Sequence, residues 1–330
     1  MIEVENLGKN YGSFEAVKDV SFSVGRDQVL GFLGPNGAGK TTIMKILTGY
    51  HFPTRGRVKI DGVSVEDDPV EIKKRIGYLP ENNPLYGDLS PDEYLHFAAS
   101  ARLLPKKERQ KAVDAAVAAC GLEGYRKQRI ESLSKGYRQR LGLAQAIIHD
   151  PDILILDEPT SGLDPNQIIE IRSLIRELGK RKTVILSTHI LQEVEAVCSR
   201  VLILNEGSIA AQGTPEEIAG TMKGGCDAWE LSLKGAASDV TDRLSRLGAE
   251  TGEVSAESLE NGIIRLGFVI RNSAPQADSG SDYTQDGELI FDWAVCQGYK
   301  IIGMTRKKLS LEDIFVKLTN EPQATGENEE

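Results

Sequence analysis

The sequence predicts an α/β fold over most of its length, built on a largely parallel sheet with some antiparallel strands, and a smaller α+β unit after it. Two observations carry this prediction. The segments 29–33, 153–156 and 184–186 are continuously apolar, as strands buried on both faces of a parallel sheet are. Segments with helical spacing of apolar residues alternate with them, which is typical of parallel α/β sheets.

The first elements lead up to a glycine-rich loop. Residues 2–7 and 16–24 alternate apolar and polar side chains, which predicts two antiparallel strands. The buried strand 29–33 then enters the loop, and the apolar spacing after the loop predicts a helix. Residues 58–60 and 76–79 predict two further strands.

A helical insert in this domain is predicted at about residues 82–132. Ser90, Pro91 and Glu93 form a capping box with proline at the first helical position, which opens a helix. An alanine-rich helix follows at about residues 106–119. We therefore expect a helical subdomain inserted between strands of the sheet.

The remainder of the first domain, predicted to span residues 1–222, returns to alternating strands and helices. Its expected elements are helix 136–148, strand 153–156, a helix capped by Asp164, strand 184–186, strands 201–205 and 208–212, and a helix capped by Thr214.

A second domain is predicted over residues 223–319, after a junction that contains Gly224 and Gly225. Its patterns follow the order strand, helix, strand, strand, helix, strand, which is the ferredoxin-like α+β arrangement. The expected ranges are 229–233, 238–247, 251–258, 263–270, 287–297 and 300–305, with a polar loop over 272–286 and a last helix over 311–318. The acidic composition of residues 320–330 predicts a disordered tail.

The composition argues against several classes of function. The formal net charge is −10, from 49 acidic and 39 basic residues, so we expect no nucleic-acid partner. No apolar run reaches the roughly 18–20 residues that span a bilayer, so a membrane role requires another chain. The N-terminus has the pattern of neither a signal nor a transit peptide, and the four scattered cysteines are typical of a reduced, cytoplasmic protein.

A phosphate-binding loop of the form G-x-x-x-x-G-K-T lies between strand 29–33 and the helix after it. Its residues are Gly34, Pro35, Asn36, Gly37, Ala38, Gly39, Lys40 and Thr41, followed by Thr42. The glycines let successive N–H groups point at a phosphate chain, and the helix adds its positive N-terminal end. Lys40 can reach the β- and γ-phosphates, and Thr41 can offer its hydroxyl to Mg²⁺. Because a chance glycine-rich turn lacks this context, the loop predicts a site for a nucleoside triphosphate.

Further polar residues are predicted at the same edge of the sheet. Asp157 and Glu158 end the apolar strand 153–156, at the carboxyl edge where open α/β sheets bind ligands. Phosphoryl transfer needs a carboxylate to hold Mg²⁺ and a polar group to orient the attacking water, and these two residues suit those roles. His189 follows strand 184–186 and could hydrogen-bond a γ-phosphate, although a lone histidine is more often structural.

Two signals are weaker. Ser134 and Gly136 open a helix whose free N–H groups make an anion site, but the same residues also suit an ordinary capped helix. Tyr11 could stack on a purine ring, although a lone tyrosine in a turn more often packs against the protein.

Taken together, these motifs resemble those of the ATP-binding subunits of ABC (ATP-binding cassette) transporters, over residues 1 to about 220. The phosphate loop 34–41, a signature sequence at 133–140, a Walker B strand with its glutamate at 153–158, a D-loop at 161–164 and a histidine at 189 occur in the family's order. The signature between phosphate loop and Walker B strand separates this family from other phosphate-loop ATPases. The resemblance implies an ATP hydrolase with an ABC cassette fold.

The resemblance also implies a role for each residue. Tyr11 would stack on adenine, and the phosphate loop through Thr42 would hold the phosphates. Thr41 and Asp157 would hold Mg²⁺, Glu158 would activate water, and His189 would contact the γ-phosphate. Ser134 and Gly136, with Asp164 of the D-loop, would complete the site of a second subunit. The chain is therefore expected to act as a homodimer, or paired with another ABC ATPase, that closes head to tail around two ATP molecules.

Three positions depart from the family's common pattern. Lys135 and Tyr137 replace a glycine and a glutamine of the signature, whereas the contacting Ser134 and Gly136 remain. Glu81 stands where a glutamine is usual. Its carboxylate can ligate Mg²⁺ but adds negative charge near the γ-phosphate. We therefore expect Glu81 to slow hydrolysis or to tighten its dependence on Mg²⁺.

The sequences at 77–81, 133–140 and 311–315 are similar to one exporter branch of the family. Its members, some linked to gliding motility or multidrug efflux, work with a separate permease of the second ABC-exporter class. This similarity implies a cytoplasmic subunit, held at the inner face of the membrane by an integral membrane permease that selects the transported substrate. The alternative is a soluble ABC ATPase that acts on ribosomes or DNA. Such proteins of the translation type usually hold two cassettes and a basic linker, whereas this chain has one cassette and is acidic.

Overall fold

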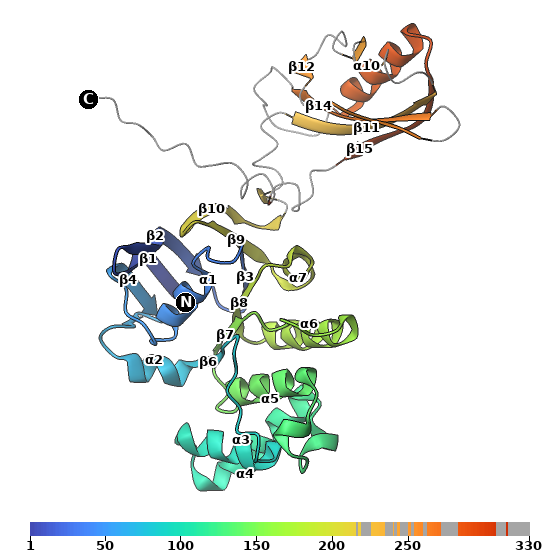
Figure 1. Ribbon diagram of the computed structural model, residues 1–330. Helices are drawn as coiled ribbons and strands as arrows, with labels where there is room; N and C mark the ends of the chain where they lie inside the picture. Colours follow the sequence, from blue (N-terminus) through green and yellow to red (C-terminus); the bar gives the residue numbers. More distant parts are fainter. Residues whose placement is uncertain are drawn as a thin grey trace, which may run out of the picture. The chain divides into compact units, whose positions relative to one another are not determined.

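The computed structural model describes two units, Met1–Pro215 and Glu216–Val316, each with its own hydrophobic core (Figure 1). The described residues are 1–215, 217–218, 226–234, 240, 243–244, 250–251, 254–259, 263–271, 283–307 and 315. Several predicted features lie wholly or largely outside them. These are the helix capped by Thr214, the junction at 223–225, the helix 238–247, most of the loop 272–286, the helix 311–318 and the tail 320–330.

The first unit contains every strand and helix expected before residue 214. Its elements are β1 (Ile2–Tyr11), β2 (Phe14–Val24), β3 (Val29–Leu33), α1 (Lys40–Leu47), β4 (Arg55–Ile60), β5 (Val63–Ser64), α2 (Pro69–Arg75), β6 (Ile76–Leu79), α3 (Pro91–Ala101), α4 (Lys106–Cys120), α5 (Lys135–Ile147), β7 (Ile153–Asp157), α6 (Pro165–Gly179), β8 (Thr183–Thr188), α7 (Leu191–Val197), β9 (Arg200–Asn205) and β10 (Ser208–Gly213).

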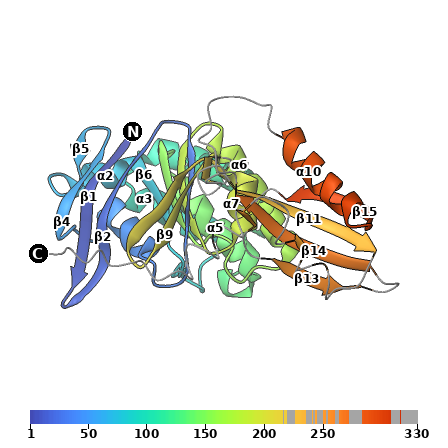
Figure 2. The same ribbon diagram turned by 90° about the horizontal axis from the view of Figure 1, so that it is seen from above.

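The strands of this unit form two sheets. The larger has the order β10-β9-β3-β8-β7-β6, in which only β10 runs antiparallel to its neighbour, so the predicted parallel character is confirmed. The antiparallel strands β1, β2, β4 and β5 do not join it but form a sheet of their own (Figure 2). The reason is their alternating pattern, which offers one apolar face for a neighbouring layer and one face for water.

Helix α1 lies between the two sheets. Its apolar residues Ile43, Met44, Ile46 and Leu47 belong to one buried cluster with β1 residues such as Val4 and with residues of β3, β7 and β8. The helix that follows the phosphate loop is therefore held from both sides. The opposite face of the parallel sheet is covered by α5, α6 and α7.

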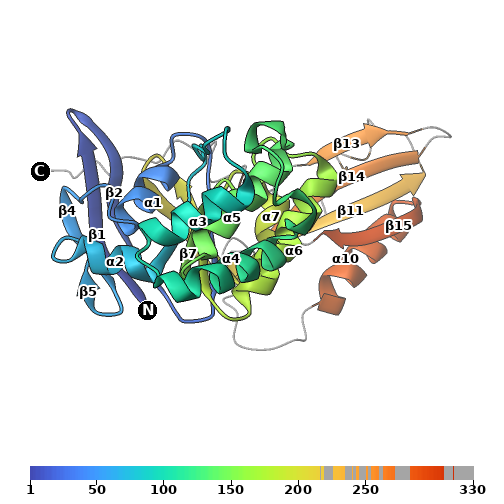
Figure 3. The same ribbon diagram turned by 90° about the horizontal axis from the view of Figure 1, so that it is seen from below.

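The predicted helical insert is present as α3 and α4, which pack against each other and against α5 (Figure 3). The capping box at the start of α3 is formed as expected. Ser90 Oγ accepts from Glu93 N at 3.3 Å, and the Glu93 carboxylate accepts from Ser90 N at 2.8 Å. This cap starts the helix at the residue that the sequence indicates.

Two helices were missing from the sequence interpretation. Helices α2 and α7 have seven residues each, too few for a clear period of 3.6. Asp68 caps α2 through Glu71 N at 2.9 Å, but only Ile72 of this helix is fully buried. Helix α7 begins after Ile190 without a side-chain cap from the described residues.

The second unit is described in part, as an antiparallel sheet with a helix on one face. Its elements are β11 (Cys226–Lys234), β12 (Glu250–Thr251), β13 (Ser255–Ser258), β14 (Ile263–Arg271), α10 (Tyr283–Cys296) and β15 (Lys300–Lys307). The sheet order is β12-β14-β11-β15, with β13 also paired to β14. Ile290 and Trp293 of α10 pack on Leu231 and Phe268 of the sheet. The helix begins four residues earlier than predicted, and the single expected strand 251–258 is divided into β12 and β13.

Candidate active site

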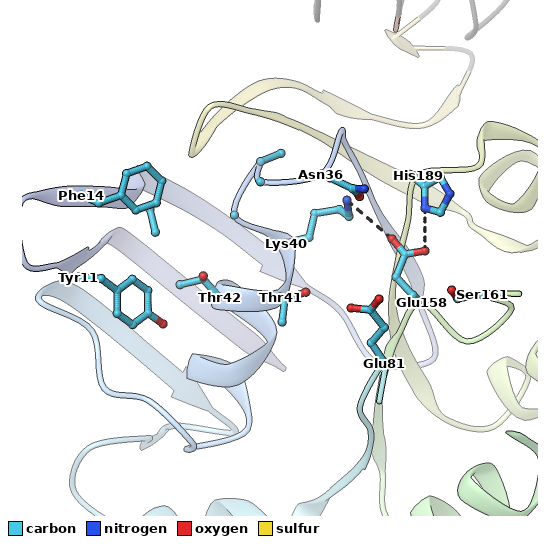
Figure 4. A pocket seen from close by; sticks show the side chains of 14 residues that line it. Tyr11, Phe14, Asn36, Lys40, Thr41, Thr42, Glu81, Glu158, Ser161 and His189 are labelled. Atoms are coloured by element: carbon cyan, nitrogen blue, oxygen red, sulfur yellow. Dashed lines mark hydrogen bonds and ion pairs between the residues drawn. The ribbon is translucent and has the colours of Figure 1, made fainter. Parts of the chain in front are cut away.

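A cleft of about 490 Å³ opens at the carboxyl edge of the parallel sheet, beside the phosphate loop (Figure 4). Its lining residues come from β1, β2, the loop and start of α1, and the segments after β6, β7 and β8. They are Tyr11, Phe14, Ala16, Asn36, Gly37, Ala38, Gly39, Lys40, Thr41, Thr42, Glu81, Glu158, Ser161 and His189. Figure 4 shows Tyr11 and Phe14 at one end of the cleft, with Glu158 and His189 at the other. Lys40 lies between these two ends.

The phosphate loop depends on two glycines with positive φ. Gly37 and Gly39 have φ of 84° and 100°, a region that disfavours residues with a side chain. A Cβ atom at Gly39 would also lie 2.8 Å from the carbonyl oxygen of Ala16. Helix α1 starts directly after Gly39, and no described side chain caps it. Its first N–H groups are therefore left for an anion in the cleft.

Gly34 and Pro35 do not line the cleft; their carbonyl oxygens hold Lys40. Lys40 Nζ donates to them at 2.7 Å and 3.2 Å and lies 3.7 Å from Glu158 Oε1. A Cβ atom at Gly34 would lie 2.4 Å from Leu204 O, so glycine is needed there for packing against β9. Burial lowers the pKa of Lys40, an effect that Glu158 opposes. A phosphate chain would give this buried ammonium group further compensation.

Asp157 presents one buried oxygen that has no partner among the described residues. Its Oδ1 accepts from Thr41 Oγ1 at 3.3 Å and from Ser187 Oγ at 2.5 Å, whereas Oδ2 is buried and unpaired. Such an oxygen needs a donor or a cation. No group of three or more His, Cys, Asp or Glu in the described part of the chain could hold a metal by itself. Asp157 and Thr41 therefore fit a Mg²⁺ ion that takes its other ligands from phosphate and water.

Glu158 is held in an unusual conformation next to Asp157. Its φ is 48°, in the left-handed region that is uncommon for a side chain of this size. Ser187 stabilises this backbone, because Glu158 N donates to its Oγ at 3.0 Å and to its carbonyl oxygen at 3.2 Å. Strained residues of this kind often occur at functional sites.

The carboxylate of Glu158 faces His189, and Oε2 hydrogen-bonds His189 Nδ1 at 3.0 Å. Burial raises the pKa of Glu158, and this effect is opposed first by the hydrogen bond to His189. His189 itself is half-exposed at the mouth of the cleft. A buried carboxylate with a raised pKa is suited to accept a proton near neutral pH.

Three further predicted site residues, Ser134, Gly136 and Asp164, lie outside the cleft. Ser134 caps α5 by accepting from Tyr137 N at 3.4 Å, and Gly136 lies in the first turn of this helix. Asp164 caps α6 by accepting from Gln167 N at 3.0 Å. None of the three lines the cleft. The other predicted residues line the cleft, except for Gly34 and Pro35, whose carbonyl oxygens hold Lys40, and Asp157, which hydrogen-bonds Thr41.

The structure adds residues to the site that the sequence interpretation did not include. Phe14 lines the cleft at the same end as Tyr11, and the signal was an aromatic residue directly after Gly12 and Ser13. Ser161 lines the cleft beside Glu158. Ser187 supports both carboxylates, and its signal was a polar residue at the end of the apolar strand 184–186.

A strand, a phosphate loop and a helix, with a carboxylate at the end of the parallel strand β7, define a phosphate-loop nucleotide-binding protein. The family model for the ABC transporter matches residues 17–161. The ABC transporter ATP-binding protein YxlF of Bacillus subtilis is 34% identical, over 97% of this chain and 100% of that protein. The chain belongs to the ATP-binding subunits of ABC transporters, and its cassette is that of an ATP hydrolase.

Two further comparisons bear on activity and assembly. The Nod factor export ATP-binding protein I of Ralstonia nicotianae is 36% identical, over 70% of this chain and 72% of that protein. A dimeric structure of the ATP-binding cassette MJ0796, in a post-hydrolysis state with ADP and Pi, has a TM-score of 0.59 and 25% identity. The match covers 65% of the present chain and 98% of the MJ0796 chain. In the described part of the present chain, no helix has the length and apolarity needed to cross a membrane.

Proposed function

We propose that this chain couples ATP hydrolysis in a head-to-tail dimer to export through a separate integral membrane permease. The observation that carries the proposal is an incomplete site. One copy gathers the phosphate loop, Glu158 and His189 in a cleft, but leaves Ser134 and Gly136 outside it. The relative from Ralstonia is named as an export ATP-binding protein, which supports the direction of transport. In this proposal the permease holds the chain at the cytoplasmic face of the membrane.

Within one copy, the residues divide the work along the cleft. Tyr11, with Phe14 beside it, stacks on the adenine, and the N–H groups of the phosphate loop together with Lys40 hold the phosphates. Thr41, Asp157 and Glu81 hold Mg²⁺, which supplies positive charge to the phosphate oxygens when bound. Glu158 accepts a proton from the attacking water, and His189 keeps the Glu158 carboxylate in position and contacts the γ-phosphate.

The second copy completes the site in this proposal. Ser134 and Gly136 stand at the N-terminus of α5, where backbone N–H groups and the helix dipole favour an anion. When the two copies close, this end faces the γ-phosphate bound by the other copy, with Asp164 close by. Hydrolysis then removes the group that both copies share, and the dimer opens.

A second cleft, of about 550 Å³, suits the transmission of this movement. It is lined by residues 81–85, Gly87, Ile130, Glu131, Lys135, Arg138 and Gln139. Glu81 lines both clefts, so a change at the nucleotide reaches the helical insert through the segment after β6. We propose that α3 and α4, within the insert at about 82–132, pass the movement to the permease.

Purification from the membrane fraction tests whether the chain binds an integral membrane partner. The full-length chain, tagged and isolated in mild detergent from its own cells, is expected to bring a multi-span membrane protein with it. ATP hydrolysis by the complex should then be higher than that of the chain alone. The alternative is a soluble ABC ATPase that acts on ribosomes or DNA. Co-sedimentation with ribosomes, without any co-purifying membrane protein, would favour that alternative.

Replacing Glu81 with glutamine is expected to raise the hydrolysis rate or to change its dependence on Mg²⁺ concentration. The variant removes a negative charge from the cleft beside the phosphate loop but keeps an oxygen ligand. The measurement is the steady-state rate over a titration of Mg²⁺ at fixed ATP. Glu66→Gln, at an exposed position that lines neither cleft, is the matched control. A rate and a Mg²⁺ requirement that are both unchanged in Glu81→Gln would refute the assigned role.

The second unit is proposed to be a ferredoxin-like accessory domain, within boundaries of about 223–319. The described antiparallel order β12-β14-β11-β15, with α10 on one face, supports this arrangement. The first domain, in the same proposal, ends at about residue 222.

A further inference from the structure

Glu193 in helix α7 is a buried acidic residue that none of the recognised motifs includes. The residue as a whole is 2% exposed. Oε1 accepts a short hydrogen bond from Thr160 Oγ1, and Oε2 accepts one from Thr188 Oγ1 at 2.7 Å. Arg172 of α6 places a guanidinium nitrogen 3.8 Å from Oε1. One carboxylate therefore joins four segments of the first unit.

A buried carboxylate at this position carries a large desolvation cost. Taking a charge out of water costs several kcal/mol, and a well-packed apolar residue is often as stable as a buried ion pair. Packing alone therefore does not account for Glu193. An ionised carboxylate, unlike an apolar side chain, accepts hydrogen bonds from both threonine hydroxyls. It therefore restricts the backbone at each threonine.

The two threonines flank the reacting end of the cleft. Thr160 lies two residues after Glu158, and Thr188 directly precedes His189. Thr188 Oγ1 also accepts from Ile190 N at 3.0 Å, so it supports the turn that carries His189. The strained backbone of Glu158 is thus anchored twice to the end of β8. Ser187 binds it directly, and Thr188 holds the following turn through Glu193 and Thr160.

We propose that Glu193 is a positioning residue for ATP hydrolysis, which sets the placement of the Glu158 carboxylate relative to His189. The inference rests on the proposed roles of Glu158 and His189. Glu193 does not line the cleft; it acts through the hydroxyls of Thr160 and Thr188. Loss of its charge lets the loop after β7 and the turn after β8 move independently, so the 3.0 Å contact between Glu158 and His189 is no longer enforced.

The test compares Glu193→Gln with Glu195→Gln, an exposed glutamate on the same helix. In Glu193→Gln, an amide group replaces one acceptor oxygen, so one buried hydroxyl loses its partner. We expect kcat to fall about tenfold to a hundredfold while the Kd for ATP changes less than about threefold, because misplacement affects the chemical step more than binding. Glu195→Gln should change neither quantity. An unchanged kcat in Glu193→Gln would overturn the proposal.

A pair of substitutions at Thr160 separates positioning from stability. Thr160→Val keeps the shape but removes the hydroxyl, whereas Thr160→Ser keeps the hydroxyl and removes a buried methyl group. We expect kcat to fall in Thr160→Val and to be retained in Thr160→Ser, although the serine variant loses apolar packing. If kcat instead follows the thermal unfolding midpoint across these variants, the effect is structural and the proposal is wrong.

A further variant, Glu158→Gln, distinguishes failure of the role proposed for Glu193 from failure of the role proposed for Glu158. If Glu158→Gln is inactive and Glu193→Gln retains full kcat, positioning by Glu193 fails while the role of Glu158 stands. If Glu158→Gln itself hydrolyses ATP at the normal rate, the proposed role of Glu158 fails, and the inference about Glu193 fails with it.

Discussion

Replacement of Glu158 with glutamine is expected to lower kcat for ATP hydrolysis by about a hundredfold to ten-thousandfold, the usual contribution of a general base. The amide cannot accept the proton of the attacking water, yet it has the same shape and can still hydrogen-bond His189. The affinity for ATP should be retained, because Lys40 and the phosphate loop are untouched. The measurements are steady-state hydrolysis and equilibrium binding of ATP to the same preparation.

The control for this prediction is Glu108→Gln, which makes the same chemical change at an exposed position of α4. It should hydrolyse ATP at the normal rate. If Glu158→Gln retains more than about a tenth of the normal kcat, Glu158 is not the general base, since the loss would be below the usual contribution of such a group.

The pH profile gives an independent readout of the same residue. Glu158 accepts a proton only when it is ionised, and burial raises its pKa above the ordinary value of 4.5. The rate should therefore fall as the pH decreases through this raised pKa, and the fall should begin at a higher pH than for an exposed glutamate. A rate that stays constant down to pH 4.5 would show that another group accepts the proton.

The second large effect is expected from Gly136→Asp, which should abolish the ATP-dependent part of dimer formation. Gly136 stands in the first turn of α5, and in the proposed dimer this turn faces the γ-phosphate held by the other copy. An aspartate there places negative charge against the phosphate and removes the effect of the helix N-terminus. The copy itself should still fold and bind ATP, because its own cleft does not include Gly136.

Sedimentation of the full chain in the Glu158→Gln background measures this effect, since hydrolysis then does not deplete ATP. The matched control is Gly124→Asp, at a glycine where an added Cβ meets no atom within 4 Å. The three atoms nearest to the added Cβ at Gly136 all belong to the end of the Gln167 side chain, which can move. Equal ATP-dependent association of the two variants would exclude a signature contact between copies.

The sequence correctly predicted the features that depend only on residues close together in the chain. The phosphate loop, the capping boxes at Ser90 and Asp164 and the apolar strands predicted at 29–33, 153–156 and 184–186 are local patterns. Their spacing and turn chemistry suffice to indicate them. The same holds for the resemblance to ABC ATP-binding subunits, because its motifs occur as short segments in a set order.

Predictions that depend on contacts between distant segments were less complete. The separation of β1, β2, β4 and β5 into a second sheet depends on α1 packing between the layers, and no single segment shows this. The short helices α2 and α7 carry too little periodicity of their own, and tertiary packing stabilises them.

In the cleft, the sequence determines which chemical groups are present, and the tertiary structure determines how they are placed. The sequence by itself determined which groups are present: a phosphate loop with Lys40 and Thr41, and the acidic pair Asp157 and Glu158 at a strand end. Only the tertiary structure decided how they are held. Burial leaves one Asp157 oxygen unpaired, and Ser187 supports the strained backbone of Glu158. Glu193, which belongs to no recognisable motif, joins the two threonines beside the site. Apart from the pair Thr188 and Glu193, these contacts join residues 29 and 33 positions apart in the chain. Burial makes their hydrogen bonds both strong and obligatory.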